Sequence, residues 1–141
     1  MRQLQRAYYC GGSKTLRVSH LSHKEQLVSQ ARKHRGYASQ RILAEYLVRQ
    51  GFRHALPVGA GRDGSDITGI EGLDIEVKSR TRLDLSGLMK QLRDRKQNGM
   101  GVGVLRLNGQ GEAAIDDWVA VIRLEDLVYL LKGSGYGSAN S

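Results

Sequence analysis

Three residues near the middle of the chain have the types and spacing needed to hold a metal ion beside a phosphate: Asp66, Glu76 and Lys78. Glu76 and Lys78 lie in an alternating segment, so a β-strand there would point both to one side, about 7 Å apart. Asp66 starts a short extended piece ten residues before Glu76. Adjacent strands would bring the two carboxylates together, and such an oxygen-rich pocket suits a hard divalent cation.

The chemistry that fits this set is phosphodiester hydrolysis. Magnesium prefers one or two carboxylates, several waters and a phosphate, and manganese can stand in its place. The ammonium of Lys78 can orient or help to deprotonate a metal-bound water, and it can face the charge that develops on a phosphate. A solvated ion pair is the commoner explanation for an isolated Glu-x-Lys. The Gly-rich loop before Asp66 and the basic charge of the chain favour the functional interpretation.

Helices must frame these residues. A polar helix is expected over 23–34, and a second, amphipathic helix over 39–50 with Gly51 as its stop. The second helix carries an apolar stripe at a spacing of 3.6 residues, formed by Ile42, Leu43, Tyr46 and Leu47. Further helices are expected from Ser86, as a cap, to about Asn98, and over 124–132.

Strands are expected between and after these helices. The segments 54–58, 66–67, 73–78, 101–107 and 118–122 have the composition of strands, and Pro57 places the first at an edge or a strand end. The order of helices and strands predicts an α/β fold with a mixed central sheet flanked by helices. One domain is expected over 23–132, preceded by a basic arm over 1–22 and followed by a flexible tail over 133–141.

The charge of the chain points to a polyanionic partner. Its 141 residues carry 22 Lys plus Arg against 14 Asp plus Glu, a net charge of +8. Residues 1–35 hold eight of the basic residues and one acid, so nearly all of the excess precedes the core. An arm that follows phosphates is one interpretation, and a solvated basic tail is the other.

Several classes are excluded or disfavoured. The single cysteine excludes a disulfide scaffold, and no apolar run approaches the roughly 20 residues of a spanning helix. No signal peptide is visible, so a cytoplasmic protein without a membrane partner is expected. Zinc is disfavoured because Cys10, His20, His23 and His34 lack the paired spacings of structural zinc sites.

The residues around the acidic motif resemble a known family. The run GRDGSDITGIEGLDIEVKSR resembles the PD-(D/E)xK nuclease core in its D-x9-E-x-K form. RGYASQRILAEYLVRQGF resembles the first core helix, and TRLDLSGLMKQLRDRKQNGMGVGVLRLNG the following helix and strand. Over about residues 35–132 the chain is similar to small phage and actinobacterial proteins described as Holliday junction resolvases or nucleases. This implies a restriction-endonuclease-like core and a Mg²⁺-dependent DNA endonuclease that acts as a homodimer.

The resemblance also assigns roles. Asp66 and Glu76 would be metal ligands, the carbonyl of Val77 a further ligand, and Lys78 the catalytic lysine. Related sequences often carry a Glu on the first helix, where this chain has Gln40. Helical geometry favours this position over Glu45, since they lie about 90° and about 130° from the centre of the apolar stripe. A neutral Gln40 could hold a metal-bound water. Because it lacks a charge, we expect a second metal ion less, and the activity could be weaker.

Other residues have weaker assignments. Gln91 matches a Gln of similar sequences that could contact substrate or orient Lys78, and an ordinary surface residue is the equal alternative. For Asp74 a solvated position is favoured over a role behind the metal ligands. Candidate DNA contacts, for which a solvated face is again the alternative, are Arg17, Lys24, Arg32, Lys33, Arg35, Arg80, Arg82, Lys90 and Arg93.

Two other functions remain open at this point. Gln40 favours a DNA-binding module on a nuclease-like fold that no longer cleaves. Such a module would show strongly salt-dependent binding without metal-stimulated cutting. A basic protein associated with RNA or the ribosome is the third hypothesis.

Overall fold

A mixed five-stranded sheet forms the centre of the molecule. The computed structural model describes residues 22–59, 62–80, 82–95, 97 and 99–136. The strands follow their chain order across the sheet, and only β3 and β4 pair in parallel. The sheet and its flanking helices confirm the predicted α/β class with a mixed sheet. The strands are β1 (Leu56–Pro57), β2 (Ile67–Thr68), β3 (Leu73–Ser79), β4 (Met100–Arg106) and β5 (Val119–Val121).

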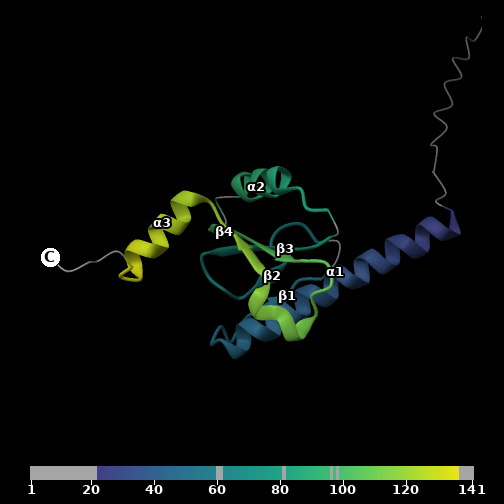
Figure 1. Ribbon diagram of the computed structural model, residues 1–141, viewed down its shortest axis with the longest axis horizontal. Helices are drawn as coiled ribbons and strands as arrows, with labels where there is room; N and C mark the ends of the chain where they lie inside the picture. The colour runs from purple at the N-terminus through teal and green to yellow at the C-terminus, as the bar shows by residue number, and fades with distance from the viewer. Residues whose placement is uncertain (1–21, 60–61, 81, 96, 98, 137–141) are drawn as a thin grey trace, which may run out of the picture.

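Helices cover both faces of this sheet. Figure 1 shows α1 (His23–Arg49) below it and α2 (Leu85–Asp94) above it. On the α1 side the core gathers Leu43 and Ala44 with Ile75 and Val77 of β3. On the α2 side a smaller core joins two leucines of α2 to Leu105 of β4. Alternation along β3 therefore sends its apolar side chains toward α1 and its polar ones toward α2.

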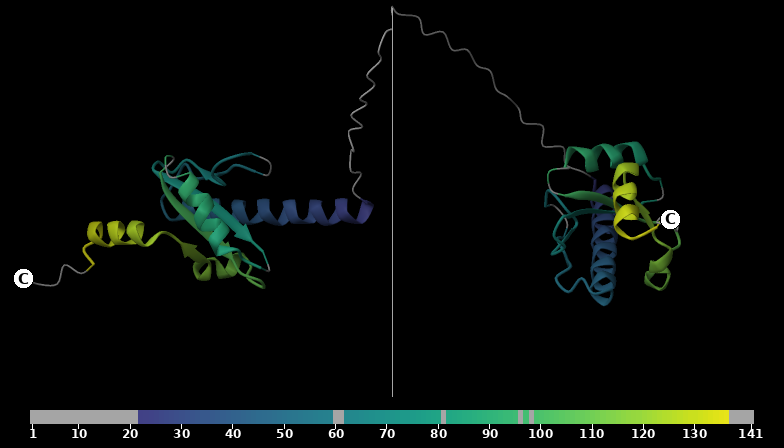
Figure 2. Two further views of the ribbon diagram at one scale, coloured as in Figure 1. Left: turned by 90° about the horizontal axis from the view of Figure 1, so that it is seen from above. Right: turned by 90° about the vertical axis from the view of Figure 1, so that its left-hand side faces the viewer.

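The first helix is continuous, and the expectation of two helices over 23–34 and 39–50 is wrong. α1 has 27 residues and begins with a capping box in which Ser22 and Glu25 bond each other's backbone N–H. Gly36 does not interrupt it, because one glycine costs a helix interior only about 1 kcal/mol. The first buried residue is Ser39, so the preceding turns project from the body, as Figure 2 shows. We call residues 23–38 the stem.

The second helix differs from its predicted limits at both ends. Asp84 rather than Ser86 is the N-cap, and its Oδ1 accepts a hydrogen bond from the Gly87 N–H at 2.9 Å. The helix ends at Asp94, with Arg95 as its C-cap. It lies close to β4 because Gly101 and Gly103 face its leucines. A Cβ at Gly103 would lie 2.7 Å from Leu88 Cδ2. This close packing brings the end of α2 over the polar face of β3.

The chain after β4 includes an element that the sequence did not predict. The 3₁₀ helix η2 (Glu112–Asp117) follows the expected turn near Asn108 and leads into β5. The last helix, α3 (Leu124–Gly133), buries none of its residues and projects at the opposite end from the stem (Figure 2). No helix in the described part of the chain is long and apolar enough to cross a membrane.

Only residue 22 of the predicted arm and residues 133–136 of the predicted tail lie within the described part of the chain. Gly133, expected to open the tail, is the last residue of α3. Almost all of the predicted arm and most of the tail lie outside the described residues.

Candidate active site

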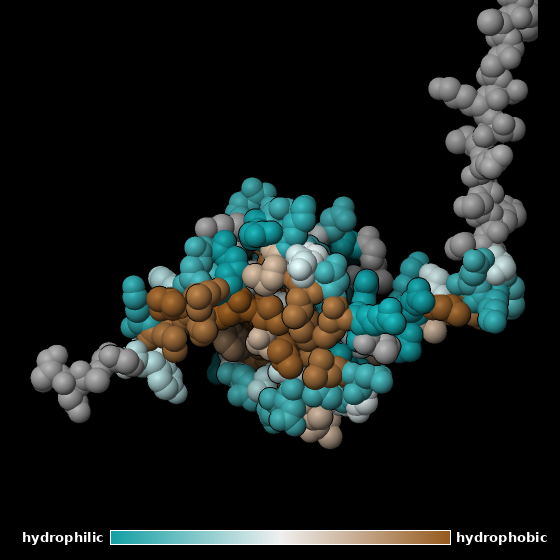
Figure 3. Space-filling model, turned by 45° about the horizontal axis from the view of Figure 1, so that its top comes forward, coloured by the Kyte–Doolittle hydropathy of each residue, from teal (hydrophilic) through white to brown (hydrophobic). Residues whose placement is uncertain are grey.

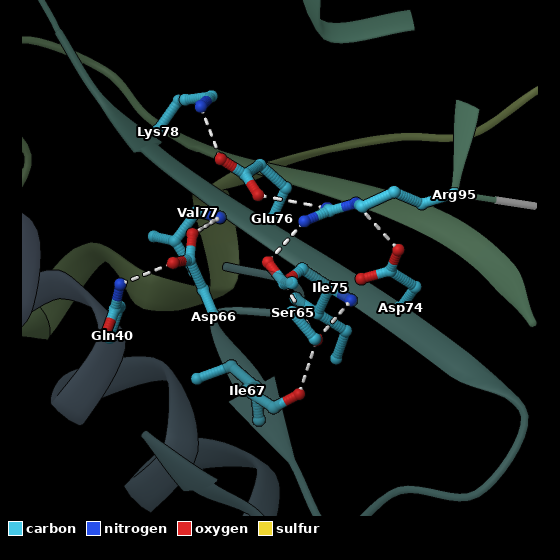
Figure 4. Close-up of polar contacts among 11 residues, drawn as sticks. Gln40, Ser65, Asp66, Ile67, Asp74, Ile75, Glu76, Val77, Lys78 and Arg95 are labelled. Carbon is cyan, nitrogen blue, oxygen red and sulfur yellow. Dashed lines mark hydrogen bonds and ion pairs between the residues drawn. The ribbon is translucent and has the colours of Figure 1, made fainter. Parts of the chain in front are cut away.

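Asp66 stands directly before β2, where hydrogen bonds of its backbone and its side chain join it to β3. Its N–H donates to the Ile75 carbonyl at 2.7 Å, which joins it to β3. Its Oδ2 accepts from the Val77 N–H at 2.7 Å. The preceding Ser65 strengthens this junction, because its Oγ accepts from the Ile75 N–H at 2.9 Å. The loop that carries Asp66 is thus attached to β3 beside Glu76 (Figure 4).

Gln40 connects α1 to this carboxylate. Its Nε2 donates to Asp66 Oδ1 at 2.6 Å, and its Oε1 accepts from the Gly59 N–H at 3.1 Å. The neighbouring Ser39 is wholly buried, and its Oγ accepts from Arg106 of β4 at 3.2 Å. α1 is therefore anchored where Gln40 meets Asp66. The rival candidate Glu45 is exposed and pairs with Arg41 instead.

Glu76 and Lys78 lie on the face of β3 that looks toward α2. Lys78 Nζ donates to Glu76 Oε1, so the expected pair is formed. It is not a freely solvated pair, because the side chain of Glu76 is 8% exposed and that of Lys78 is 23% exposed. Buried charges of this kind need specific partners, since desolvation of an ion is costly.

The second partner of Glu76 is Arg95, which the sequence analysis did not single out. Arg95 Nη2 donates to Glu76 Oε2 at 3.0 Å, and Arg95 Nη1 donates to the carbonyl of Gly64. Arg95 Nε also forms an ion pair with Asp74 Oδ2 at 2.9 Å. Asp74 is 1% exposed, so its favoured solvated position is wrong. The guanidinium of Arg95 lies against its carboxylate (Figure 4).

The surroundings of Asp66 favour its protonated form. The pKa of Asp66 is raised to about 6, chiefly by burial and to a smaller extent by the charge of Glu76, while the hydrogen bond from the Val77 N–H lowers it. The cations Lys78 and Arg95 lower this pKa as well, by less than burial raises it. A carboxylate whose pKa lies near neutrality and which sits beside a second acid is typical of functional sites. A divalent cation would favour the ionised form.

A cavity lies beside Lys78. It has a volume of about 260 Å³, and Lys78, Arg80, Asp84 and Gln91 contribute its polar lining. Gln91, on α2, therefore shares this cavity with the lysine. Both residues line one cavity, so Gln91 is near enough to Lys78 for the two predicted roles, contact with substrate or orientation of Lys78.

The candidate DNA contacts fall into three groups. Arg17 lies outside the described residues. Lys24, Arg32, Lys33 and Arg35 are exposed on the stem. Arg80, Arg82, Lys90 and Arg93 are exposed around the end of β3 and on α2, where Lys90 pairs with Asp94 at 2.8 Å.

The donor atoms at the site are oxygens, which suits Mg²⁺ or Mn²⁺. Asp66 and Glu76 supply carboxylates from adjacent strands. Val77 donates its N–H to Asp66, and its carbonyl, predicted as a ligand, points to the same edge of β3. Within the described residues, no group of three or more His, Cys, Asp or Glu side chains is arranged to hold a metal. The two carboxylates of Asp66 and Glu76 suit Mg²⁺, an ion that usually keeps several waters when it binds a protein.

Comparisons of the chain with protein-family models, curated proteins and solved structures give no match.

Proposed function

We propose that this protein is a metal-dependent DNA endonuclease that hydrolyses phosphodiester bonds, with Holliday junctions or other branched DNA as its substrates. The observation that carries the proposal is the position of Asp66, which bonds Val77 of β3 and Gln40 of α1 and lies close enough to Glu76 for that charge to raise its pKa. The resemblance of the surrounding sequence to the PD-(D/E)xK nucleases and their restriction-endonuclease-like core supports the same function.

Each residue has a role that its contacts suggest. Asp66 and Glu76 would hold Mg²⁺ or Mn²⁺, with the Val77 carbonyl as a further ligand. The ion supplies charge to stabilise the phosphate and to acidify a water. Gln40 would hold Asp66 in place, since its amide donates to Asp66 Oδ1 and accepts from the Gly59 N–H. Lys78 Nζ donates a hydrogen bond to Glu76, and it would stabilise the charge that develops on a phosphate oxygen or orient the attacking water.

The cavity beside Lys78 would admit the scissile phosphate. Arg80 and Gln91 lie in its wall, so a cation and an amide donor could contact phosphate oxygens there. The basic stem would bind more distant phosphates through its exposed side chains. Such an enzyme would act in the cytoplasm of a bacterial or phage-infected cell.

We also propose that the enzyme is a homodimer, since two strands of a junction must be cut symmetrically. Helix α3 supports this proposal with apolar side chains that nothing in the described chain buries. Figure 3 shows apolar surface running from this helix onto the body of the molecule. Large exposed apolar patches mark interaction sites. The exposed residues are Leu124, Leu127, Val128, Tyr129, Leu130 and Leu131.

Charge favours a second copy of the chain as the partner of α3. Glu125 and Asp126 lie in its first turn, where both pair with Arg123 and leave a net negative charge, and Lys132 lies in its last turn. An antiparallel pair of α3 helices would place the acidic end of each beside Lys132 of the other. A two-fold axis makes this contact twice, which is the arrangement of the commonest oligomers.

The test of the proposed function is cleavage of junction, flap, single-stranded and duplex DNA with Mg²⁺ or Mn²⁺, comparing the wild type with Lys78→Ala. Lys78→Ala should lower the cleavage rate by roughly 100-fold or more, because a single charged donor at the transition state has this order of effect. Arg53→Ala, which removes an exposed basic side chain that has no proposed role in the site or the dimer, serves as the control. A wild type that cuts none of these DNAs, or a fully active Lys78→Ala, would contradict the proposal.

A DNA-binding module that does not cleave is the second candidate, and one observation favours it. Both candidate carboxylates already have partners on each oxygen: Gln40 and Val77 on Asp66, and Lys78 and Arg95 on Glu76. Such a protein would bind branched DNA with steep salt dependence and without any effect of Mg²⁺ on cutting.

A further inference from the structure

The guanidinium of Arg95 is the cation that connects the acidic face of β3 to the loop before Asp66. It contacts a carboxylate oxygen of Glu76, a carboxylate oxygen of Asp74 and the carbonyl of Gly64. Its side chain is 16% exposed. The two carboxylates lie on β3, where Figure 4 shows them beside Arg95, and the carbonyl belongs to the loop before Asp66. A set of two carboxylates and one carbonyl is also a set that a hard divalent cation would accept.

Asp74 shows that this arrangement is not saturated. The carboxylate is 1% exposed, and neither of its oxygens has a hydrogen-bond donor among the described residues. The 2.9 Å contact with Arg95 Nε is an ion pair without the geometry of a hydrogen bond. A buried carboxylate left this way is unusual, because lost hydration is normally replaced by hydrogen bonds. The buried negative charge of Asp74 would be stabilised by a cation bound next to it.

We propose that Arg95 is a built-in cation of the candidate active site, occupying the place where a second divalent ion would otherwise bind between Asp74 and Glu76. This inference rests on the proposed metal-dependent function. The guanidinium neutralises two buried acids, so a single ion would bind at Asp66 and would share Glu76 with Lys78 and Arg95. Gln40 has a matching effect, since it places an amide where a carboxylate would attract a further ion.

Arg95 is in this view a positioning residue. Through Glu76 it orients one metal ligand, and through the Gly64 carbonyl it holds the loop two residues before the other, Asp66. Outer partners that orient metal ligands in this way commonly change metal affinity by roughly 10–100-fold when they are altered. An ordinary structural ion pair would affect the folding of the protein without changing how many ions it binds.

The test is calorimetric titration of the full chain with Mn²⁺ in the absence of DNA, which does not depend on activity. The wild type should bind one ion per chain. Arg95→Gln should bind two, because Asp74 and Glu76 become free to hold the second. Arg95→Lys should still bind one, with affinity roughly 10–100-fold weaker, since an ammonium cannot hold Glu76 and the loop in the same geometry. Arg93→Gln, which removes an exposed arginine from the same helix, should bind like the wild type.

A second measurement distinguishes a change in ion binding from a failure of the variant to fold. Circular dichroism should show Arg95→Gln folded once Mn²⁺ is present, because the second ion replaces the lost charge. If Arg95→Gln binds one ion as the wild type does, or stays unfolded in saturating Mn²⁺, the inference is wrong. A wild-type affinity in Arg95→Lys overturns the positioning role. A wild type that binds no Mn²⁺ instead contradicts the metal-dependent function itself.

Discussion

Gln40 and Asp66 form a pair in which an amide stands where a second acid would be costly. Burial and, to a smaller extent, the charge of Glu76 already raise the pKa of Asp66 to about 6. A carboxylate at position 40 would raise the pKa of Asp66 still further. The Gln40 amide instead donates a hydrogen bond to Asp66 at 2.6 Å and favours its ionised form. The metal-free site is thereby stabilised, at the expense of one possible metal ligand.

The raised pKa of Asp66 predicts opposite effects of pH on stability and on ion binding. The folded state holds its proton more tightly than the unfolded chain. This contribution to stability is therefore full below about pH 4 and is lost as pH rises through about 6. Mg²⁺ needs the ionised form, so the increase in melting temperature that Mg²⁺ produces should grow above about pH 6. Thermal melts with and without Mg²⁺ from about pH 5 to about pH 8 measure both effects.

Two asparagine variants identify the group responsible. Asp66→Asn should remove the pH-dependent part of the Mg²⁺ effect together with most of the effect itself. Asp63→Asn changes an exposed acid of the same loop and should leave the inflection near pH 6 in place. An inflection that persists in Asp66→Asn would assign the titration to another group.

Sequence reasoning found the residues of this site whose relation is local. The alternation of residues 73–78 correctly places Asp74, Glu76 and Lys78 on one face of a strand. Arg95 had no such signal, because its contacts depend on where α2 ends and on how close α2 lies to β4. The burial of Asp74 followed from the same packing, so it could not be read from the strand either.

At the scale of elements, short-range signals set helix ends less reliably than they set helix positions. Ser39 resembles a helix start, and Gly36 with Tyr37 resembles a break, yet α1 runs through both. Ser39 instead uses its hydroxyl inside the helix, where it donates to the Arg35 carbonyl at 3.1 Å. Continuing a formed helix is easier than starting a new one, because nucleation is the costly step.

The continuity of α1 predicts that Gly36→Ala stabilises the protein. A Cβ at this position meets no atom within 4 Å, and alanine favours the helix over the unfolded chain. The expected gain is about 0.5–1 kcal/mol in the free energy of unfolding. Urea denaturation should show a higher midpoint with an unchanged slope.

Gly51 provides the contrasting control for this substitution. It follows the C-cap of α1 with φ of 103°, a conformation that suits glycine. Gly51→Ala should therefore destabilise the protein by about 1–3 kcal/mol. If Gly36→Ala were as harmful as Gly51→Ala, the helix would have to be broken near residue 36.

At the scale of the whole molecule, the body lies between two helices that extend away from it in opposite directions. The stem is basic, whereas α3 is mainly apolar. The sequence predicted both segments as helical but could not show that they leave the body. Exposure depends on the absence of neighbours, and no local pattern reports that.

The proposed dimer predicts that acidic side chains on α3 separate the two copies. The double variant Leu127→Glu and Leu131→Glu alters one exposed stripe of the helix and should shift the protein from dimer to monomer. Light scattering after size-exclusion chromatography measures this change in mass. Leu27→Glu makes the same change on the exposed stem and should leave the dimer intact. A monomeric wild type would contradict the proposal.

The backbone hydrogen bonds in the two halves of α1 should open at different rates. In the stem, the backbone hydrogen bonds are protected only by the helix itself, so amide hydrogens there exchange after local fraying. Beyond Ser39, Leu43 and Ala44 are packed in the core, and exchange requires opening of the whole domain. The stem can therefore unwind and re-form many times while Gln40 keeps its place against Asp66. A nucleic acid could reshape the stem as it binds, and the geometry at the site of chemistry would not change.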